Sequence, residues 1–136
     1  MQARVKLIEE DRLSAVATSK HAVVMDASED KQASTPLEYC LMALCGCTAS
    51  DVLAILRKKR EPFTSLEVSA VAERAETYPK VFTKINLLYR VDGPVARKSV
   101  EDAVRLSKEK YCSVSAMLAK TAEITTAIAL TSEEKK

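Results

Sequence analysis

Apolar and polar residues alternate along three short runs in the first 26 residues. The runs are Arg4–Glu9, Leu13–Thr18 and His21–Asp26, separated by pairs of polar residues suited to turns. Alternation with a period of two places successive side chains on opposite faces of a strand. We therefore predict three short strands, followed by a polar loop over Ala27–Thr35.

The clearest helix signal begins at Thr35–Glu38 (Thr-Pro-Leu-Glu). Threonine offers an N-cap hydroxyl, proline suits the first helical position, and glutamate three residues after threonine closes a capping box. From Leu37 to Leu56 almost every turn carries apolar side chains on more than one side, and Arg57–Arg60 and Pro62 mark the end. A helix that is apolar nearly all round belongs inside a protein or an oligomer. We therefore expect it at the centre of a dimer.

The rest of the chain predicts two strands, two helices and a last strand. The predicted elements are a strand Ser65–Glu76, a hairpin turn Tyr78–Lys80, a strand Val81–Val91, an amphipathic helix Val95–Tyr111, a short helix to Lys120, a strand Glu123–Leu130 and a polar tail Thr131–Lys136. The order is βββ-α-ββ-α-α-β. Because hairpins dominate it, we predict an α+β fold with largely antiparallel sheets, in a single domain over residues 1–136.

Composition and charge argue against several classes of partner. Lys and Arg number 21 against 19 Asp and Glu, the net charge is +2, and only 4% of residues are aromatic, with no Trp. A nucleic-acid surface usually needs a basic stripe with aromatic side chains, so we expect no nucleic-acid partner. Two glycines leave no phosphate-cradling loop, which makes nucleotide-dependent chemistry unexpected.

The chain shows no targeting signal that we can identify. Its N-terminus lacks an apolar stretch followed by a small-residue cleavage site, and uninterrupted apolar runs such as Val52–Leu56 are too short to span a bilayer. We therefore predict a cytoplasmic protein without a membrane partner. Thiols are kept reduced in that compartment, so the four cysteines are expected to be reactive, metal-bound or buried rather than bridged structurally.

Local chemistry singles out Cys112 among the cysteines. A thiol reacts as its thiolate, whose formation is favoured at a helix N-terminus and beside cations. Cys112 is predicted just before a short helix, with Lys108 and Lys110 nearby. Both features predict a lowered pKa, although a small buried hydrophobic residue explains Cys112 equally well.

Cys47 has the less favourable local setting. It lies within the apolar helix, where burial raises the pKa of a thiol, and Asp51 one turn later raises it further if ionised. A reactive Cys47 therefore needs a positive partner from elsewhere, and Arg4, Arg12 and the Arg57–Arg60 cluster are the available donors. The residues alone do not choose among them.

A metal site is not indicated by the sequence. Cys45 and Cys47 lie two apart on the predicted helix and point about 200° apart, so they do not readily face one ion. A structural zinc site takes four Cys or His ligands, and His21 is the only histidine. We expect neither a metal nor another cofactor, and we expect Cys40 and Cys45 to be packing residues.

Three segments together resemble the OsmC/Ohr superfamily, and most closely the YhfA-like branch of OsmC family proteins. They are Thr35–Glu38, Cys45–Val52 and Glu109–Ser115, and the resemblance covers essentially the whole chain. A cysteine in a long apolar helix, with a second cysteine at a Cys-x-Val-Ser break, is a fairly specific combination. The resemblance implies an intertwined homodimer, with sheets wrapped around long central helices and active sites at the interface.

The resemblance also implies a thiol peroxidase. By position, Cys47 matches the cysteine that attacks an organic hydroperoxide or H2O2, and Cys112 matches the resolving cysteine, with a dithiol reductant regenerating both. The peroxidases place a glutamate and an arginine beside the attacking thiol, for which Glu38 and Arg12 are our candidates. However, the family's glutamate commonly follows the proline directly, where this chain has Leu37. On a helix, one position turns the carboxylate by about 100°.

This departure keeps two other functions open. A non-enzymatic redox-sensing dimer would keep the cysteine pair without an efficient activating pair. A small-molecule-binding dimer would use a cavity at the interface and bind its ligand whether or not the thiols are blocked.

Overall fold

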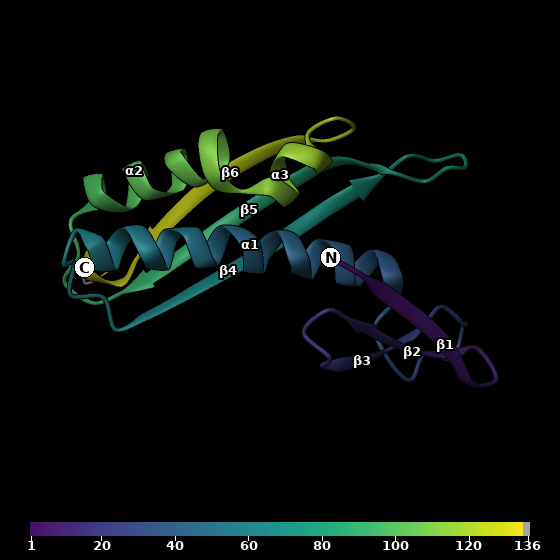
Figure 1. Ribbon diagram of the computed structural model, residues 1–136. Coiled ribbons are helices and arrows are strands. Elements are labelled where there is room, and N and C mark those ends of the chain that lie inside the picture. The colour runs from purple at the N-terminus through teal and green to yellow at the C-terminus, as the bar shows by residue number, and fades with distance from the viewer. Residues whose placement is uncertain (135–136) are drawn as a thin grey trace. The chain divides into compact units, whose positions relative to one another are not determined.

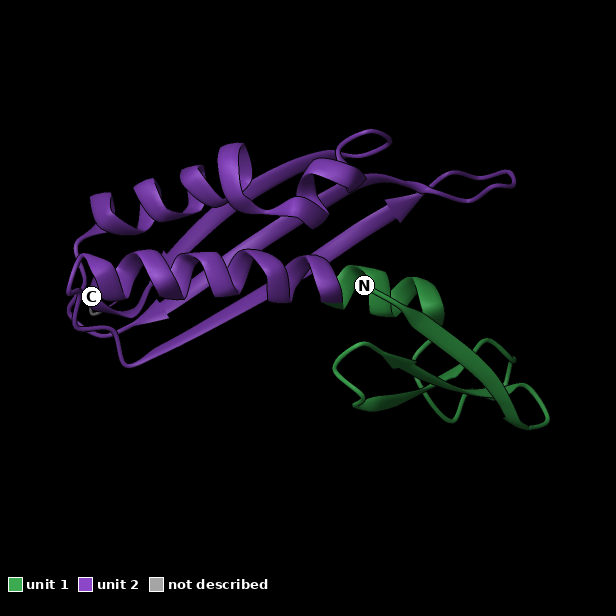
Figure 2. Ribbon diagram, in the orientation of Figure 1, with its two compact units in different colours: residues 1–42 green, residues 43–136 purple. Residues whose placement is uncertain are grey.

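The computed structural model describes residues 1–134 and divides into two compact units, residues 1–42 and residues 43 onward (Figure 2). Each unit has its own three-stranded sheet. A single domain over the whole chain stays a prediction.

The first unit contains the three predicted strands. They are β1 (Ala3–Glu9), β2 (Arg12–Ala17) and β3 (Ala22–Asp26), paired antiparallel in the order β1-β2-β3 (Figure 1). Each observed end lies within one residue of the predicted end. The alternating pattern was therefore sufficient to define this sheet.

One face of the first sheet is apolar, because paired residues point to the same side. The register aligns two rows of three residues, Val5–Ala15–Val23 and Leu7–Leu13–Met25. We call these six residues the first-sheet apolar face. Val5, Leu7 and Val23 on this face are exposed to solvent.

The long helix α1 spans Pro36–Lys58, slightly beyond the predicted range. The predicted capping box is present, since the Glu38 N–H donates to Thr35 Oγ1 at 3.1 Å and the Thr35 N–H donates to Glu38 Oε1 at 2.9 Å. The interaction satisfies two N–H groups at the start of the helix. The segment that we identified as a helix start does begin the helix.

By length and composition, α1 could cross a membrane. Its apolar residues are interrupted in the sequence, but the continuous helix contains an 18-residue window with a mean hydropathy of 1.8. Only 22% of that window is buried within one chain.

The sheet of the second unit is mixed. It consists of β4 (Ser65–Arg74), β5 (Phe82–Asp92) and β6 (Glu123–Leu130) in the order β4-β5-β6, and the last strand has its predicted bounds. The β4–β5 pair is antiparallel, but the β5–β6 pair is parallel. Three of the four pairings in the described residues are thus antiparallel. The exception arises because the chain crosses over through helices before β6 instead of returning by a hairpin.

The crossover differs from the predicted uninterrupted helix Val95–Tyr111. It contains α2 (Arg97–Leu106), a π-helical turn η1 (Ser107–Tyr111) and α3 (Ser113–Leu118). At the break, the Cys112 N–H donates to the Ser107 carbonyl at 2.8 Å. A short 3₁₀ turn, η2 (Thr131–Glu133), occupies the start of the predicted polar tail, whose last two residues lie outside the described range.

The core of the second unit lies between α1 and β5. A stripe on α1, four residues apart, is buried and consists of Leu44, Thr48, Val52 and Leu56. Inward-facing residues of β5, among them Ile85, Leu87, Tyr89 and Val91, are also buried. The spacing of four keeps the stripe on one face of the helix. A polar residue, Thr48, therefore lies in the middle of an apolar seam.

Candidate functional site

The structure brings together Cys47, Asp51 and Cys112. Their two sulfur atoms and a carboxylate oxygen all lie within 4.8 Å of one another. Cys47 and Asp51 are one turn apart on α1, and Cys112 is the N-cap residue of α3. We call these three residues the thiol–carboxylate cluster. The fold thus places the two cysteines singled out in the sequence, 65 positions apart, side by side.

The prediction that the pKa of Cys112 is lowered was wrong. Cys112 is only 3% exposed, and burial raises the pKa of its thiol to about 11. The neighbouring Cys47 adds to this increase in pKa. The Ser115 N–H, which donates to the sulfur at 3.4 Å, lowers the pKa but does not offset the burial. Helix α3 has six residues, so little dipole is available to offset the loss of water. The Lys108 ammonium does not compensate, because it donates to the Ile124 carbonyl at 2.8 Å.

A chain of hydroxyl groups leads away from Asp51 into the core. Ser107 Oγ donates to Asp51 Oδ2 at 2.8 Å, Ser107 Oγ and Thr48 Oγ1 are 2.8 Å apart, and Thr48 Oγ1 and the Tyr89 hydroxyl are 2.7 Å apart. Each hydroxyl has one proton to give. Since the proton of Ser107 goes to Asp51, Thr48 must donate to Ser107, and Tyr89 must donate to Thr48. We call these four residues the hydroxyl relay.

The three hydroxyls of the relay are almost completely buried. Tyr89, Thr48 and Ser107 are 1%, 2% and 0% exposed, and burial raises the pKa of Tyr89. Buried polar groups are costly unless they are hydrogen-bonded, and linked groups polarise one another. The relay therefore holds Asp51 in one orientation beside the two sulfurs.

Sequence reasoning missed Thr48, Ser107 and Tyr89 as parts of the site. The signal that was available is the position of Thr48, four residues after Leu44 and four before Val52. A polar residue in a buried stripe needs a partner. The partners themselves come from other elements, and the sequence does not identify them.

The predicted activating residues have partners of their own in the first unit. Glu38 closes the capping box, and its hydrogen bonds with Thr35 lower the pKa of its carboxyl group. Arg12 Nη2 donates to Glu9 Oε2 at 2.8 Å. The observed interactions of Glu38 and Arg12 are thus with residues other than the cysteines.

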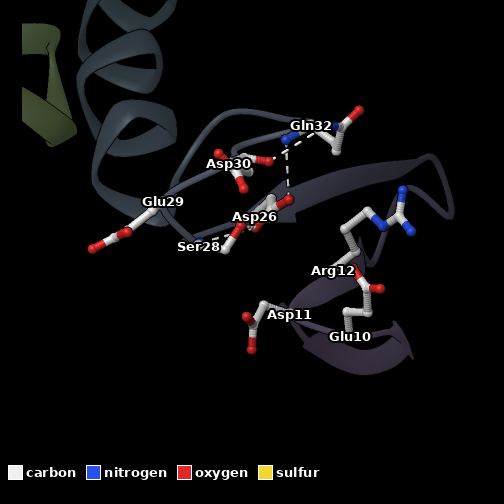
Figure 3. Close-up of a pocket in the computed structure, with 8 residues that line it drawn as sticks. All are labelled: Glu10, Asp11, Arg12, Asp26, Ser28, Glu29, Asp30 and Gln32. Carbon is white, nitrogen blue, oxygen red and sulfur yellow. Dashed lines mark hydrogen bonds between the residues drawn. The ribbon is translucent and has the colours of Figure 1, made fainter.

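Arg12 also borders an acidic pocket of about 370 Å³ within the first unit (Figure 3). In its wall, Asp26 accepts hydrogen bonds from the Ser28 hydroxyl and from the N–H groups of Gln32 and Ser28. These bonds lower the pKa of Asp26 to about 2. The polar groups of this pocket fix the loop after β3, and its lining contains no thiol.

A more apolar pocket, of about 580 Å³, lies beside the thiol–carboxylate cluster. Asp51 belongs to its lining, together with Ala54, Ile55, Lys58 and Lys59 of α1, Leu106 of α2 and Tyr111 of η1. The pocket therefore meets the cluster at Asp51 and combines apolar walls with two lysines.

The other cysteines are half-buried. All four cysteines are free thiols, and burial raises the pKa of Cys45. Neither Cys40 nor Cys45 is part of the thiol–carboxylate cluster. That Cys40 and Cys45 are packing residues stays a prediction.

The fold and the cluster define a class of protein. It is an α+β protein in which a long apolar helix and a break in a crossover connection bring two cysteines together. The family model described as OsmC-like protein matches residues 28–127. The chain belongs to the OsmC-like family, which confirms the resemblance, the α+β class and the order of elements.

Individual relatives support this assignment. The chain is 44% identical to protein YhfA of Escherichia coli K12 over 92% of this chain and 94% of that protein. A hypothetical protein from Aquifex aeolicus VF5 has a crystal structure that is similar with a TM-score of 0.83, at 27% identity and over 95% of this chain and 96% of that one.

A more distant structure has the same fold. The organic hydroperoxide resistance protein OhrB of Bacillus subtilis is similar with a TM-score of 0.65, at 10% identity and over 94% of this chain and 98% of that chain. At this identity the likeness shows the fold alone. Family membership also identifies α1 as the core helix of a soluble fold, which explains how it passes the length and composition test for a membrane span.

Proposed function

We propose that the protein is a thiol-dependent peroxidase that reduces organic hydroperoxides or H2O2 through Cys47 and Cys112. The observation that carries the proposal is the proximity of the two sulfur atoms, within 4.8 Å. The fold is shared with a protein named for organic hydroperoxide resistance. We take organic hydroperoxides as the substrate class from that name.

The proposed reaction has three steps, which are attack on the peroxide, formation of a disulfide and its reduction. The Cys47 thiolate attacks the terminal peroxide oxygen, the O–O bond breaks, and the alkoxide takes a proton and leaves as an alcohol, or as water from H2O2. The sulfenic acid on Cys47 then condenses with the Cys112 thiol to form a disulfide and water. A dithiol reductant restores both thiols by exchange and becomes a disulfide itself.

The different surroundings of the two sulfurs support the order of these roles. Burial keeps Cys112 protonated at neutral pH, which makes it a poor attacking group. A protonated Cys112 beside Cys47 is instead placed to condense with a sulfenic acid formed on Cys47. We therefore assign attack to Cys47 and resolution to Cys112.

The pocket beside Asp51 supports access for substrate. Its walls include Ala54, Ile55 and Leu106, which suit the organic portion of a hydroperoxide. Asp51 is the residue of the thiol–carboxylate cluster that lines this pocket, so the oxygen atoms of the substrate would approach the sulfurs past Asp51.

Glu38 and Arg12 stay part of the proposal as the activating pair. Their capping-box and Glu9 interactions favour the second candidate function, a redox-sensing or small-molecule-binding dimer in which the thiols react without efficient activation. The peroxide rate separates the two candidates, because a peroxidase must outpace free cysteine.

We propose further that the protein works as a cytoplasmic homodimer. Proteins of this family are typically dimers, and α1 is only partly covered within one chain. The cytoplasm supplies the reducing conditions under which a dithiol partner can regenerate the pair.

The test is a peroxide titration of the reduced protein. One equivalent of cumene hydroperoxide should remove two titratable thiols per chain, and peptide mapping should find Cys47 joined to Cys112. Cys112→Ser should accumulate a sulfenic acid on Cys47, whereas Cys47→Ser should leave the peroxide largely unreacted.

Cys45→Ser is the matched control, since Cys45 lies on the same helix but outside the cluster. It should keep the wild-type rate. Oxidation of Cys112 first would reverse the assigned roles. A rate no higher than that of free cysteine would refute the peroxidase and favour the second candidate function.

A further inference from the structure

We propose that Cys47, Asp51 and Cys112 form a binding site for a thiophilic divalent cation, with Zn²⁺ as the representative ion. Two thiolates and one carboxylate would be the protein ligands, and a fourth position would stay open. Three protein ligands and one open position are typical of zinc sites that exchange a ligand. The inference goes beyond the proposed peroxidase, because nothing in that reaction needs a metal.

The dimensions of the cluster fit one ion. The ligand atoms lie within 4.8 Å of one another, and two sulfurs bound to one tetrahedral Zn²⁺, each at about 2.3 Å, lie about 3.8 Å apart. Small side-chain rotations therefore bring all three atoms into coordination range. Cys47 and Asp51, four residues apart on α1, share a helix face, and Cys112 approaches from the N-cap of α3.

The surroundings of Asp51 resemble the support that metal ligands receive. Ser107 donates to one carboxylate oxygen at 2.8 Å, and Thr48 and Tyr89 hold Ser107 in turn. An ionised carboxylate has further acceptor sites for an ion. Hydrogen-bonded partners of this kind orient ligating groups and raise metal affinity. The relay is the independent observation that distinguishes this cluster from a chance grouping of polar side chains.

Charge and ligand type select the ion. Two thiolates and a carboxylate carry three negative charges, and thiolate sulfur favours zinc over magnesium or calcium. Binding of Zn²⁺ displaces the two thiol protons to solvent and involves no change in oxidation state. The expectation of no metal rested on Cys45 and Cys47 as the ligand pair and on the single histidine, whereas the structure groups Cys47 with Asp51 and Cys112.

The two proposals concern the same sulfur atoms, so the metal-bound protein and the disulfide-bonded protein are mutually exclusive states. An ion that holds both thiolates prevents the formation of a Cys47–Cys112 disulfide. Metal-loaded protein should therefore lose neither thiol to peroxide until the ion is removed.

The experiment uses the full chain, reduced and metal-free, under anaerobic conditions. Calorimetric titration with Zn²⁺ alone should give one ion per chain, and Co²⁺ should produce a thiolate-to-metal charge-transfer band. Cys47→Ser and Cys112→Ser should abolish that binding. Ser107→Ala should weaken it by about 10- to 100-fold, as for other groups that support a ligand, and Cys45→Ser should bind like wild type.

Three results would overturn the inference: no Zn²⁺ binding by wild type, unchanged binding in Cys112→Ser, or one ion shared by two chains. Circular dichroism of each variant shows whether lost binding reflects lost folding, and the wild-type titration is decisive by itself. Because no peroxide is present, the metal site can fail while the peroxidase stands. A bound ion with no peroxide reactivity after its removal would refute the peroxidase alone.

Discussion

Thr48 shows how one polar side chain can organise a buried site. It occupies a position in the apolar stripe of α1 and yet makes two hydrogen bonds, to Tyr89 and Ser107. Both partners come from elements that follow α1 in the chain. Thr48 therefore fixes the register of α1 against β5 and η1 as well as supporting Asp51.

Thr48→Val should destabilise the protein by about 1–3 kcal/mol, because valine has nearly the same shape but leaves the buried Tyr89 hydroxyl without a partner. The measurement is urea unfolding followed by circular dichroism, and the midpoint should fall with little change in slope.

Ser50→Ala is the matched control for Thr48→Val. The Ser50 hydroxyl is on an exposed side of the same helix and donates to the Gly46 carbonyl. Its removal should change the free energy of unfolding by less than about 0.5 kcal/mol. Equal effects of the two substitutions would show that the relay contributes nothing beyond helix propensity.

At the residue scale, the sequence predicted that Cys47 and Cys112 come together but did not predict their environment. Cys47 and Cys112 could be selected from motifs that lie within short segments. The raised pKa of Cys112 could not be predicted, because the burial that raises it comes from elements distant in the chain. Asp51 had no assignable role without its contact to Ser107.

Among the elements, the π-helical turn η1 contributes directly to the site. Its first residue, Ser107, is fully buried, and Cys112 follows the turn directly as the N-cap of α3. Turns of this type occur frequently at functional sites. In this chain the turn delivers Ser107 to Asp51 and Cys112 to the same cluster.

The elements also show where sequence patterns stop being informative. The strand Glu123–Leu130 was predicted with its observed bounds because alternation is a local property. Its parallel pairing with β5 was not predicted, since pairing partners are chosen by the whole fold. The π turn was read as ordinary helix, because both have apolar residues at similar spacing and differ only in which carbonyl accepts each N–H.

The loop after β3 should make the stability of the first unit sensitive to acid. Hydrogen bonds lower the pKa of Asp26 from 3.8 to about 2 in the folded state. A lowered pKa stabilises the folded state above the unfolded value, and that stabilisation is lost as the pH falls from 3.8 towards 2. Asp26→Asn should reduce stability at neutral pH and flatten the pH dependence in that interval.

Asp30→Asn is the matched control for this loop, since Asp30 is exposed in the same segment. It should leave the neutral-pH stability close to that of wild type. Thermal unfolding at several pH values measures both variants. An unchanged acid transition in Asp26→Asn would contradict the role assigned to this carboxylate.

On the scale of the whole molecule, much apolar surface is left uncovered by a single chain. Only 22% of the most apolar window of α1 is buried. All of β1 is exposed, and Val5 and Leu7 of the first-sheet apolar face are among its residues. Exposed apolar area of this extent is typical of an interface between subunits.

We therefore expect an obligate dimer. Sedimentation should give twice 14.9 kDa, with no stable monomer at micromolar concentration. Leu7→Lys should weaken association, because it introduces a charge into the first-sheet apolar face.

Lys6→Gln is the control for the dimer test, since Lys6 lies next in β1 and points to the other side of the sheet. It should sediment like wild type. A folded wild-type monomer at micromolar concentration would contradict the dimer.

The separation of Cys47 and Cys112 along the chain has a consequence for the entropy of unfolding. A covalent bond between residues 65 positions apart closes a large loop and restricts the unfolded ensemble. In the chain-entropy account this lost entropy raises the free energy of unfolding by about 4 kcal/mol. The folded state already holds the two sulfurs close together, so it loses little freedom when the bond forms. Oxidation by peroxide would then leave the chain harder to unfold, and reduction would return it to a more easily unfolded form.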